Sequence, residues 1–493
     1  MSETVAKPTL SAMLEALRAG DVVDATAIYI NGAWTHSDGV DSIDVFSPAT
    51  EEVIAKVASG SLSDVDRAVA AAQAALPAWA ATPASERGAY LTKISAIITE
   101  RLEEFAELAS RDVGAPVEAS KLIQLGLPIF NFGFYGDLAA TYNFDGEMVG
   151  NSLVTKEPIG VVGCITPWNF PAHQIALKVA AAWAAGCTVV VKPSEVAPLL
   201  AYALADVFDE VGLPKGVFNM ISGEGPIVGE ALVAHDGVDM ISFTGSTRAG
   251  RRISEVASGA LKRVSLELGG KSANVILEDA DLEAAVAGGL MNSIGLNTGQ
   301  ACTALTRFVV PRSKLSEVEA IAAEQASVYT IGAWDEEGTV LGPLVSKVQY
   351  DKVRGYIQKG IDEGARLVAG GLDSGRDKGY FVTPTVFSDV SNDMTIAREE
   401  IFGPVISIIP YDSEDEAIAI ANDTVYGLGG AVWAGDKDHA VAVARQIRTG
   451  QIIVNGGDFN PAAPFGGFKQ SGQGREAGTA GIEEFLETKA MHL

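Results

Sequence analysis

The sequence predicts an α/β fold made of two lobes, each built around a mainly parallel sheet. Continuous apolar, β-branched runs alternate with helical stretches after Gly160, a pattern typical of a parallel sheet covered on both faces. We expect these strands at 161–165, 188–191, 217–221 and 239–243. A second alternating series follows Glu267 and ends near Val454, with helices expected at 313–327, 349–363, 414–422 and 437–448. The 493 residues are enough for two or three domains.

The first 160 residues predict less regular structure. Residues 1–27 look like a loose leader with one short amphipathic helix. Ser63, with an aspartate three residues later, is expected to cap an Ala-rich helix that ends at Pro77. A longer helix is expected at 84–113, and the polar, alternating segment 140–156 is expected to form an exposed hairpin.

The composition excludes several classes of partner. A formal net charge of −27 argues against nucleic acid and anionic membranes, because both require a basic surface. The longest uncharged apolar run, 179–191, is too short to span a bilayer, and the N-terminus lacks the pattern of a signal peptide. Three cysteines suit a reducing compartment, and five histidines show no metal-binding spacing. We expect a cytoplasmic protein without a metal.

Cys302 is the first candidate for chemistry. It lies in Gly-Gln-Ala-Cys-Thr, between an expected helix that begins at Asp281 and an expected strand at 308–310. A thiol on such a turn is open to a substrate, and the thiolate is a strong nucleophile near neutral pH. The alternative is a buried free cysteine, which is the commoner case; we expect this for Cys164 and Cys187.

Two further motifs point to a nucleotide. Gly245-Ser246-Thr-Arg-Ala-Gly250 follows an expected strand and has the outer glycines of a dinucleotide-binding loop, with Thr247 in place of the middle glycine. A simple turn and helix cap explains it equally well. Lys192-Pro-Ser-Glu195 ends another expected strand, where its charges can bind a ribose or form an ordinary surface pair.

Three further motifs carry candidate functional groups. Asn169, held between two prolines in PWNFP, is a rigid donor for an oxyanion. Glu267, among Leu and Gly residues in LELGGK, is expected to have a pKa raised toward that of a general base. Glu400 and Phe402 lie in EEIFGP, a carboxylate and an aromatic ring before a Gly-Pro stop.

Together, PWNFP, KPSE, FTGST, LELGGK, GQAC, EEIFGP and PFGGFKQSG in this order and spacing are highly specific. The chain resembles the NAD(P)-dependent aldehyde dehydrogenase superfamily from Tyr29 to about Glu487. The resemblance implies that Cys302 attacks the aldehyde to form a thiohemiacetal, which is oxidised to a thioester. It implies that Asn169 holds the oxyanion and that Glu267 activates the water that releases the acid. Lys178 matches a lysine near the active site of that family.

The resemblance also implies a cofactor site and a substrate pocket. Lys192 and Glu195 match the adenosine-ribose contacts, Ser246 a pyrophosphate contact, and Glu400 with Phe402 the nicotinamide-ribose contacts. We expect NAD rather than NADP, although NADP stays possible, because Glu195 should repel a 2′-phosphate. The remaining cofactor contacts implied are Ile165, Thr166, Pro167, Trp168, Ser194, Gly225, Phe243, Thr244, Gly245 and Leu268. The pocket implied is Phe170, His173, Leu177, Ala301, Thr303, Phe459 and Phe465, a mostly apolar lining that favours a hydrophobic aliphatic or aromatic aldehyde.

The same resemblance implies how the chain divides. A Rossmann-like NAD-binding domain would comprise 28–139 and 159–268, and a catalytic domain 269–470. Segments 140–158 and 471–493 would form a small β bridge between subunits of a homodimer or homotetramer, and 1–27 would be an extension outside the resemblance.

Two alternatives remain open at the level of sequence. A CoA-acylating relative would pass the acyl group to CoA, but such relatives generally lack the base that Glu267 supplies. A Cys-dependent esterase or thioesterase without a redox role could use Cys302, Asn169 and Glu267, but it leaves Ser246, Glu195 and Glu400 unexplained.

Overall fold

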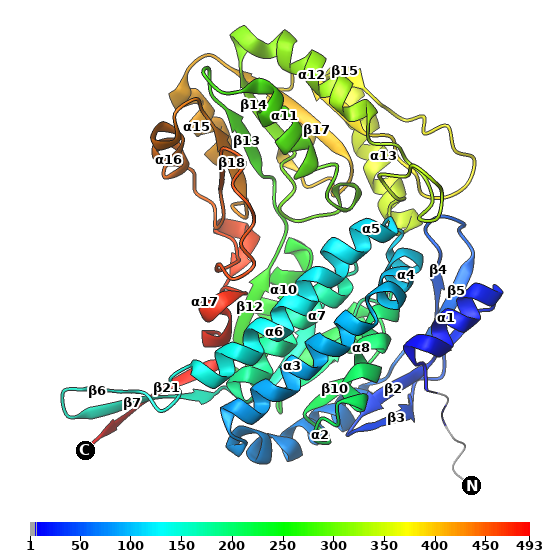
Figure 1. Ribbon diagram of the computed structural model, residues 1–493, viewed down its shortest axis with the longest axis vertical. Helices are drawn as coiled ribbons and strands as arrows, with labels where there is room; N and C mark the ends of the chain where they lie inside the picture. Colours follow the sequence, from blue (N-terminus) through cyan, green and yellow to red (C-terminus); the bar gives the residue numbers. More distant parts are fainter. Residues whose placement is uncertain (1–4, 6) are drawn as a thin grey trace.

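The computed structural model describes residue 5 and residues 7–493. These residues form two lobes along the long axis, and a narrow arm leaves the lower lobe (Figure 1). Each lobe is organised around one mainly parallel sheet, as the alternating series predicted. Within the described part of the chain, no helix is both long and apolar enough to cross a membrane.

The sheet of the lower lobe has eight strands in the order β20-β12-β11-β8-β9-β10-β2-β3. The five central strands are parallel, whereas β20, β2 and β3 join antiparallel. The strands are Ala27–Ile30 (β2), Ala33–His36 (β3), Val161–Ile165 (β8), Thr188–Lys192 (β9), Phe218–Met220 (β10), Met240–Thr244 (β11), Arg263–Glu267 (β12) and Gly472–Gln473 (β20).

Alternate side chains of this sheet fill two separate cores. Val162 and Cys164 of β8 face a core shared with α3, α4, α6, α7 and α8, whereas Val161 and Ile165 face one shared with α2, α9 and α10. Burial on both faces explains why these strands are apolar without alternation. The helices are Leu62–Ala81 (α2), Ala84–Glu100 (α3), Leu102–Val113 (α4), Val117–Ala119 (α5), Gly126–Thr141 (α6), Pro171–Ala185 (α7), Leu199–Glu210 (α8), Glu230–Ala234 (α9) and Thr247–Ser258 (α10), with π-helical turns at Ser120–Leu125 (η1) and Gly225–Gly229 (η2).

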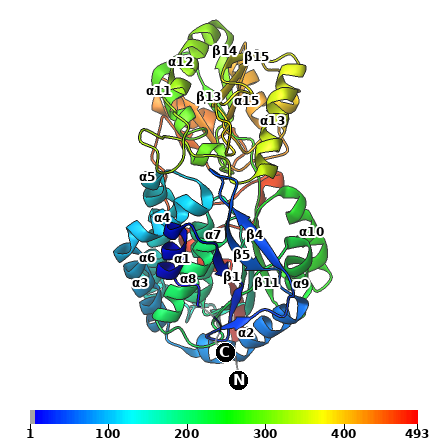
Figure 2. The same ribbon diagram turned by 90° about the vertical axis from the view of Figure 1, so that its right-hand side faces the viewer.

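A small sheet and the first helix cover one side of this lobe. The sheet has the order β1-β5-β4, with strands Val23–Ala25, Val53–Ala58 and Ser42–Phe46, and β4 reaches toward the upper lobe (Figure 2). The amphipathic helix expected in the leader is α1, Leu10–Ala19, which buries Leu10, Met13, Leu14 and Leu17.

The sheet of the upper lobe has seven strands in the order β15-β16-β17-β14-β13-β18-β19, of which only β15 is antiparallel to its neighbour. The strands are Ala273–Ile276 (β13), Arg307–Pro311 (β14), Arg366–Ala369 (β15), Thr385–Ser388 (β16), Val405–Tyr411 (β17), Gly430–Trp433 (β18) and Ile453–Val454 (β19). The helices are Leu282–Met291 (α11), Leu315–Ser327 (α12), Lys347–Asp362 (α13), Thr395–Arg398 (α14), Glu414–Asn422 (α15) and Lys437–Ala444 (α16), with short 3₁₀ turns at Asn297–Gly299 (η3), Arg312–Lys314 (η4) and Lys469–Ser471 (η5).

The arm is a three-stranded antiparallel sheet in the order β21-β7-β6. It joins the expected hairpin, Glu147–Val149 (β6) and Ser152–Pro158 (β7), to the C-terminal strand Leu486–His492 (β21), and it projects away from both lobes (Figure 1). The helix α17, Gly478–Glu483, precedes β21.

Two local expectations were wrong. The cap of α2 is Ser61 rather than Ser63, and the helix continues past Pro77 to Ala81. Burial of Trp79 in the last turn offsets the proline, whose cost inside a helix is about 3 kcal/mol. The expected helix 84–113 is broken at Arg101, whose φ of −105° and ψ of 24° turn the chain so that α3 packs on α6 and α4 packs on α8.

Candidate active site

The motifs singled out in the sequence meet at one edge of the eight-stranded sheet. PWNFP follows β8, KPSE follows β9, FTGST ends β11 and LELGGK ends β12. These four strands are parallel neighbours, so their carboxyl ends lie side by side. This is the edge at which α/β sheets bind ligands.

Cys302 follows the turn η3 at the start of a loop from the other lobe. Thr298 and Gly299 have positive φ angles of 57° and 74°, which fold the chain tightly before the nucleophile. The thiol is partly accessible, whereas Cys164 and Cys187 are buried as expected. Burial, together with the nearby Glu400 and Glu267 charges, raises the pKa of Cys302 to about 12. The free thiol is therefore protonated at neutral pH and needs a base to react.

Glu267 is the last residue of β12 and is 3% exposed. Among the described residues, no group donates a hydrogen bond to either of its carboxylate oxygens. Burial, and then the charge of Glu476, raises the pKa of Glu267 well above its ordinary value, with Lys178 and Arg475 opposing the shift. A buried carboxyl with a raised pKa and free oxygens is suited to proton transfer.

Glu476 was not predicted from the sequence. Its Oε1 lies 2.5 Å from Nζ of Lys178, and the same Nζ donates to Thr244 Oγ1 at 2.7 Å. Both charged side chains are almost fully buried. The one available signal was Lys178 itself, since a lysine on an otherwise apolar helix needs a buried partner.

Asn169 is tied to the loop of the nucleophile through backbone and side chain. Its Nδ2 donates to the carbonyl of Gln300 at 3.0 Å, and its own carbonyl accepts from Gln124 Nε2 at 2.8 Å and Asn297 Nδ2 at 2.9 Å. An amide nitrogen has two N–H donors, so one remains for an oxyanion. The sequence did not predict the contribution of Gln124 or Asn297.

The two glycines of LELGGK are required by close approaches. A Cβ on Gly269 would overlap the carboxylate of Glu400, and a Cβ on Gly270 would overlap the carbonyl oxygen of Cys302. The Gly270 N–H also donates to Glu400 Oε1 at 2.9 Å. The segment after Glu267 thus fits between the nucleophile and the carboxylate of EEIFGP.

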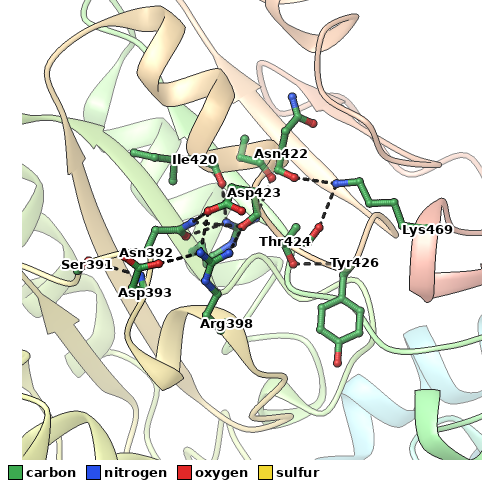
Figure 3. A network of polar contacts seen from close by, with 12 residues as sticks. Ser391, Asn392, Asp393, Arg398, Ile420, Asn422, Asp423, Thr424, Tyr426 and Lys469 are labelled. Carbon is green, nitrogen blue, oxygen red and sulfur yellow. Dashed lines mark hydrogen bonds and ion pairs between the residues drawn. The ribbon is translucent and has the colours of Figure 1, made fainter.

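A polar network anchors PFGGFKQSG to the upper lobe (Figure 3). Lys469 Nζ donates to the carbonyls of Asn422 at 2.7 Å and Thr424 at 3.1 Å, and Arg398 pairs with Asp423 at 2.8 Å in the same network.

The other end of this motif holds the loop of the catalytic carboxylate. The Ser471 hydroxyl donates to the Gly269 carbonyl at 2.7 Å, and the Leu268 N–H donates to the Ser471 carbonyl at 2.9 Å. Because Ser471 is fully buried, these contacts are shielded from water. The motif therefore holds the two residues that directly follow Glu267 and so fixes the end of β12.

The groups expected to contact a dinucleotide lie along the same edge. Lys192 Nζ pairs with Glu195 Oε2 at 2.8 Å, and Ser246 caps α10 by accepting from Ala249 N–H. The turn-and-cap interpretation of FTGST is therefore correct, and it is compatible with phosphate binding at the start of α10. Trp168 and Phe402 meet edge to face, with ring centroids 5.4 Å apart.

A cavity of about 340 Å³ beside α10 is suited to a planar apolar group. Ile165, Gly225 and Phe243 line it, together with Val233, Ala249, Ile253 and Val256. Of the other expected contacts, Thr166, Ser194, Thr244 and Leu268 are buried at the strand ends, and Pro167 and Gly245 are partly exposed there. The apolar cavity, the helix start and the Lys192–Glu195 pair together fit an adenosine diphosphate.

Most of the expected pocket residues lie near Cys302, on α7 or in buried positions, whereas one is exposed on a loop. Phe170 and Ala301 pack in one buried cluster, and Leu177 lies on the same face of α7 as Phe170 and His173. Thr303 is partly exposed beside Cys302, and Phe465 pairs with Glu476 through a β-bridge. Phe459 lies on a loop and is 55% exposed, apart from that buried cluster.

Known proteins match nearly the whole chain. The sequence profile of the aldehyde dehydrogenase family matches residues 34–491. The 3-succinoylsemialdehyde-pyridine dehydrogenase of a Pseudomonas species is 48% identical over 476 residues, covering 95% of this chain and 98% of that protein.

Solved structures give the same result. A mutant of aldehyde dehydrogenase C from Pseudomonas syringae, solved with NAD+ and octanal, is 50% identical with a TM-score of 0.93, over 95% of this chain and 96% of that chain. An aldehyde dehydrogenase of Bacillus cereus, solved with NAD+, is 39% identical with a TM-score of 0.92, over 99% of each chain.

The chain belongs to the aldehyde dehydrogenase family. It is an oxidoreductase that acts on aldehydes. The family resemblance, the fold class and the enzyme class predicted from the sequence motifs are confirmed.

Proposed function

We propose that the chain is an NAD-dependent, hydrolytic aldehyde dehydrogenase in which Cys302 is the nucleophile and Glu267 the general base. The observation that carries this proposal is the environment of Glu267, a buried carboxyl with a raised pKa and no hydrogen-bond donor on either oxygen among the described residues. Such a group is poised to take a proton, first from the thiol and later from water.

The first stage forms a covalent adduct at Cys302. Glu267 takes the thiol proton, and the sulfur bonds to the aldehyde carbon as the carbonyl π electrons move to oxygen. The second N–H of Asn169 and the backbone N–H of Cys302 donate to that oxyanion. NAD, when bound, would supply the two-electron acceptor needed for oxidation of the adduct to a thioester on Cys302.

The second stage releases the acid. Glu267 takes a proton from a water molecule whose oxygen attacks the thioester carbon, and the carbon–sulfur bond breaks to return Cys302. Glu267 must release the thiol proton before it acts again. The Lys178–Glu476 pair lies within electrostatic reach of Glu267 and shifts its pKa. Lys178 and Glu476 thus support the base without contacting the substrate.

The cofactor-binding edge supports NAD. The Glu195 carboxylate would accept the hydroxyls of an adenosine ribose and would repel a 2′-phosphate, which disfavours NADP. Lys192 would contact the same sugar, and Ser246 with the start of α10 would bind the pyrophosphate. Glu400 and Phe402 would hold the nicotinamide ribose and ring. Related structures solved with NAD+ support the same cofactor.

The architecture supports separate functions for the parts of the chain and the formation of an oligomer. We assign NAD binding to 28–139 with 159–268, catalysis to 269–470, and subunit bridging to 140–158 with 471–493. The projecting arm supports a homodimer or homotetramer, because its β6 edge strand is exposed and available for pairing. The segment 1–27 lies outside these assignments, although α1 packs against the NAD-binding part.

The apolar cluster of Phe170 and Ala301 supports a hydrophobic aldehyde. Octanal in the related Pseudomonas syringae structure is an aldehyde of this kind.

The decisive experiment is Glu267→Gln with NAD and octanal. We expect a thioester on Cys302 that forms more slowly than in the parent enzyme and then persists, so that intact-mass spectrometry detects it, because the amide can neither take the thiol proton nor activate water. The exposed Glu103→Gln serves as the control and should turn over normally. Full turnover by Glu267→Gln without an adduct would place the base elsewhere. NADH formation by the parent enzyme only when CoA is present would instead establish the acylating reaction.

A further inference from the structure

His173 is the one residue of α7 that is not buried. The helix otherwise lies inside the lower lobe, between the sheet and α6, so each of its other residues from Pro171 to Ala185 is excluded from solvent. The partly accessible His173 marks the place where solvent-accessible space reaches this helix.

That space lies on the side of the nucleophile. Phe170, His173 and Leu177 recur at a spacing of three and four residues, so they occupy one stripe along α7. Phe170 packs in a cluster with Ala301, the residue before Cys302. His173 is three residues beyond Phe170, which corresponds to about 4.5 Å along the helix axis from the residue that packs beside the nucleophile loop.

A hydrogen bond from α6 fixes the tautomer of the His173 ring. Asn131, on α6 and 1% exposed, donates through Nδ2 to Nδ1 of His173 at 3.1 Å. Burial and the charge of Lys178 lower the pKa of His173 to about 3, so the ring is neutral at physiological pH. A neutral ring that accepts at Nδ1 carries its proton on Nε2.

Unpartnered polar atoms gather around the same stripe. Gln174, next to His173 and also on the Phe170 side of α7, is 6% exposed, and Gln124 is 1% exposed. Neither Oε1 atom has a hydrogen-bond partner among the described residues. A buried amide oxygen without a hydrogen-bond partner costs stability unless a ligand or a water molecule donates to it. This region is therefore suited to a substrate with polar groups as well as an alkyl chain.

We propose that the Nε2–H of His173 donates a hydrogen bond to an acceptor oxygen on the chain of the aldehyde substrate, and that Asn131 is the positioning residue that fixes this donor. The proposal rests on aldehyde oxidation at Cys302. An extended chain advances about 1.2 Å per bond, so a substrate that runs along α7 from Phe170 to His173 has its acceptor about four bonds beyond the aldehyde carbon. The preferred substrate class is an oxo-aldehyde with a second carbonyl near carbon 5.

The test compares 5-oxohexanal with hexanal, two substrates that differ only by the carbonyl. We expect kcat/KM of the parent enzyme to be at least tenfold higher for 5-oxohexanal, because a site built around a donor discriminates against a ligand that leaves it unpaired. His173→Leu should lower the ratio of the two kcat/KM values about tenfold, mainly through KM of the oxo-aldehyde. His173→Gln, which keeps an N–H donor, should restore most of the ratio, and the exposed His439→Leu is the control.

A second measurement keeps the proposal testable if His173→Leu does not fold. Nitrogen-15 NMR of histidine-labelled parent enzyme should show one neutral histidine protonated at Nε2, and Asn131→Leu should convert its signals to a mixture of tautomers. NADH from both aldehydes with the same ratio in the parent and His173→Leu would overturn the proposal, as would an Nδ1-protonated ring. No NADH from either aldehyde with the parent enzyme would overturn the proposed oxidation itself, and this inference with it.

Discussion

Lys178 and Glu476 form a buried ion pair, with Nζ 2.5 Å from Oε1, although 298 residues separate them in the chain. The pair joins the helix after the oxyanion asparagine to the stretch that follows PFGGFKQSG. Its carboxylate is the largest nearby charge raising the pKa of Glu267, and its lysine opposes that effect. The balance within this pair therefore adjusts the pH at which the proposed base works, in addition to the larger effect of burial.

Glu476→Gln should shift the acid limb of the pH–rate profile to lower pH. The base form of Glu267 is lost as pH falls through its pKa, and a raised pKa puts this loss at a higher pH than for an ordinary carboxylate. Removing the Glu476 charge lowers that pKa, so activity should persist to lower pH. Profiles of kcat/KM against pH test this, with the exposed Glu483→Gln as the control.

The same variant should be less stable. Glu476→Gln leaves the Lys178 charge buried without its partner, which costs about 3–5 kcal/mol when one member of a buried pair is removed. Urea unfolding of the NAD-free enzyme measures the loss. Unchanged stability and an unmoved acid limb would show that the two groups are not coupled in solution.

The residue types with inherent chemistry were predictable. Cys302, Glu267 and Asn169 lie in short motifs whose glycines and prolines indicate turns and a restricted backbone. The alternating apolar runs predicted both sheets. Glu476 was not predictable, because its partner is distant in sequence and its own neighbours look like a surface segment.

Positioning groups were missed for the same physical reason. Gln124, Asn297 and Ser471 act through hydrogen bonds to backbone atoms of other segments, and such contacts leave no local pattern. The cap at Ser61 was misplaced by two residues because Ser61 and Ser63 have equal capping ability, and only the packing of α2 decides between them.

Gly270→Ala should greatly reduce aldehyde oxidation. A Cβ there overlaps the carbonyl oxygen of Cys302, a backbone atom that cannot rotate away, so the nucleophile loop must shift. A shift of this size should lower kcat at least a hundredfold, since small misplacements of reacting groups are costly. Gly355→Ala, in the middle of α13 with open space around it, is the matched control and should keep full activity. Equal kcat in the two variants would show that the loop tolerates the displacement.

Cys302→Ala should abolish aldehyde oxidation and leave cofactor binding intact. The cysteine is the nucleophile, but the expected contacts to the adenosine and the pyrophosphate lie at strand ends of the other lobe. Only Glu400 and Phe402 come from the lobe of Cys302. Tryptophan fluorescence should report saturable NAD binding in this variant, because Trp168 lies beside Phe402. Cys164→Ala, in the buried core of β8, is the control and should remain active. Turnover by Cys302→Ala would move the nucleophile to another residue.

Glu195→Gln should shift cofactor preference toward NADP. In the parent enzyme the Glu195 carboxylate pairs with Lys192 at 2.8 Å, so it both repels a 2′-phosphate and occupies the lysine that could bind it. Neutralising Glu195 removes the repulsion and frees Lys192, and we expect the ratio of kcat/KM for NADP to that for NAD to rise at least tenfold, which corresponds to about 1.4 kcal/mol. The exposed Glu255→Gln should leave the ratio unchanged. If the ratio in Glu195→Gln stays at the parent value, the 2′-hydroxyl is read by another group, and the Lys192–Glu195 pair serves only to hold the end of β9.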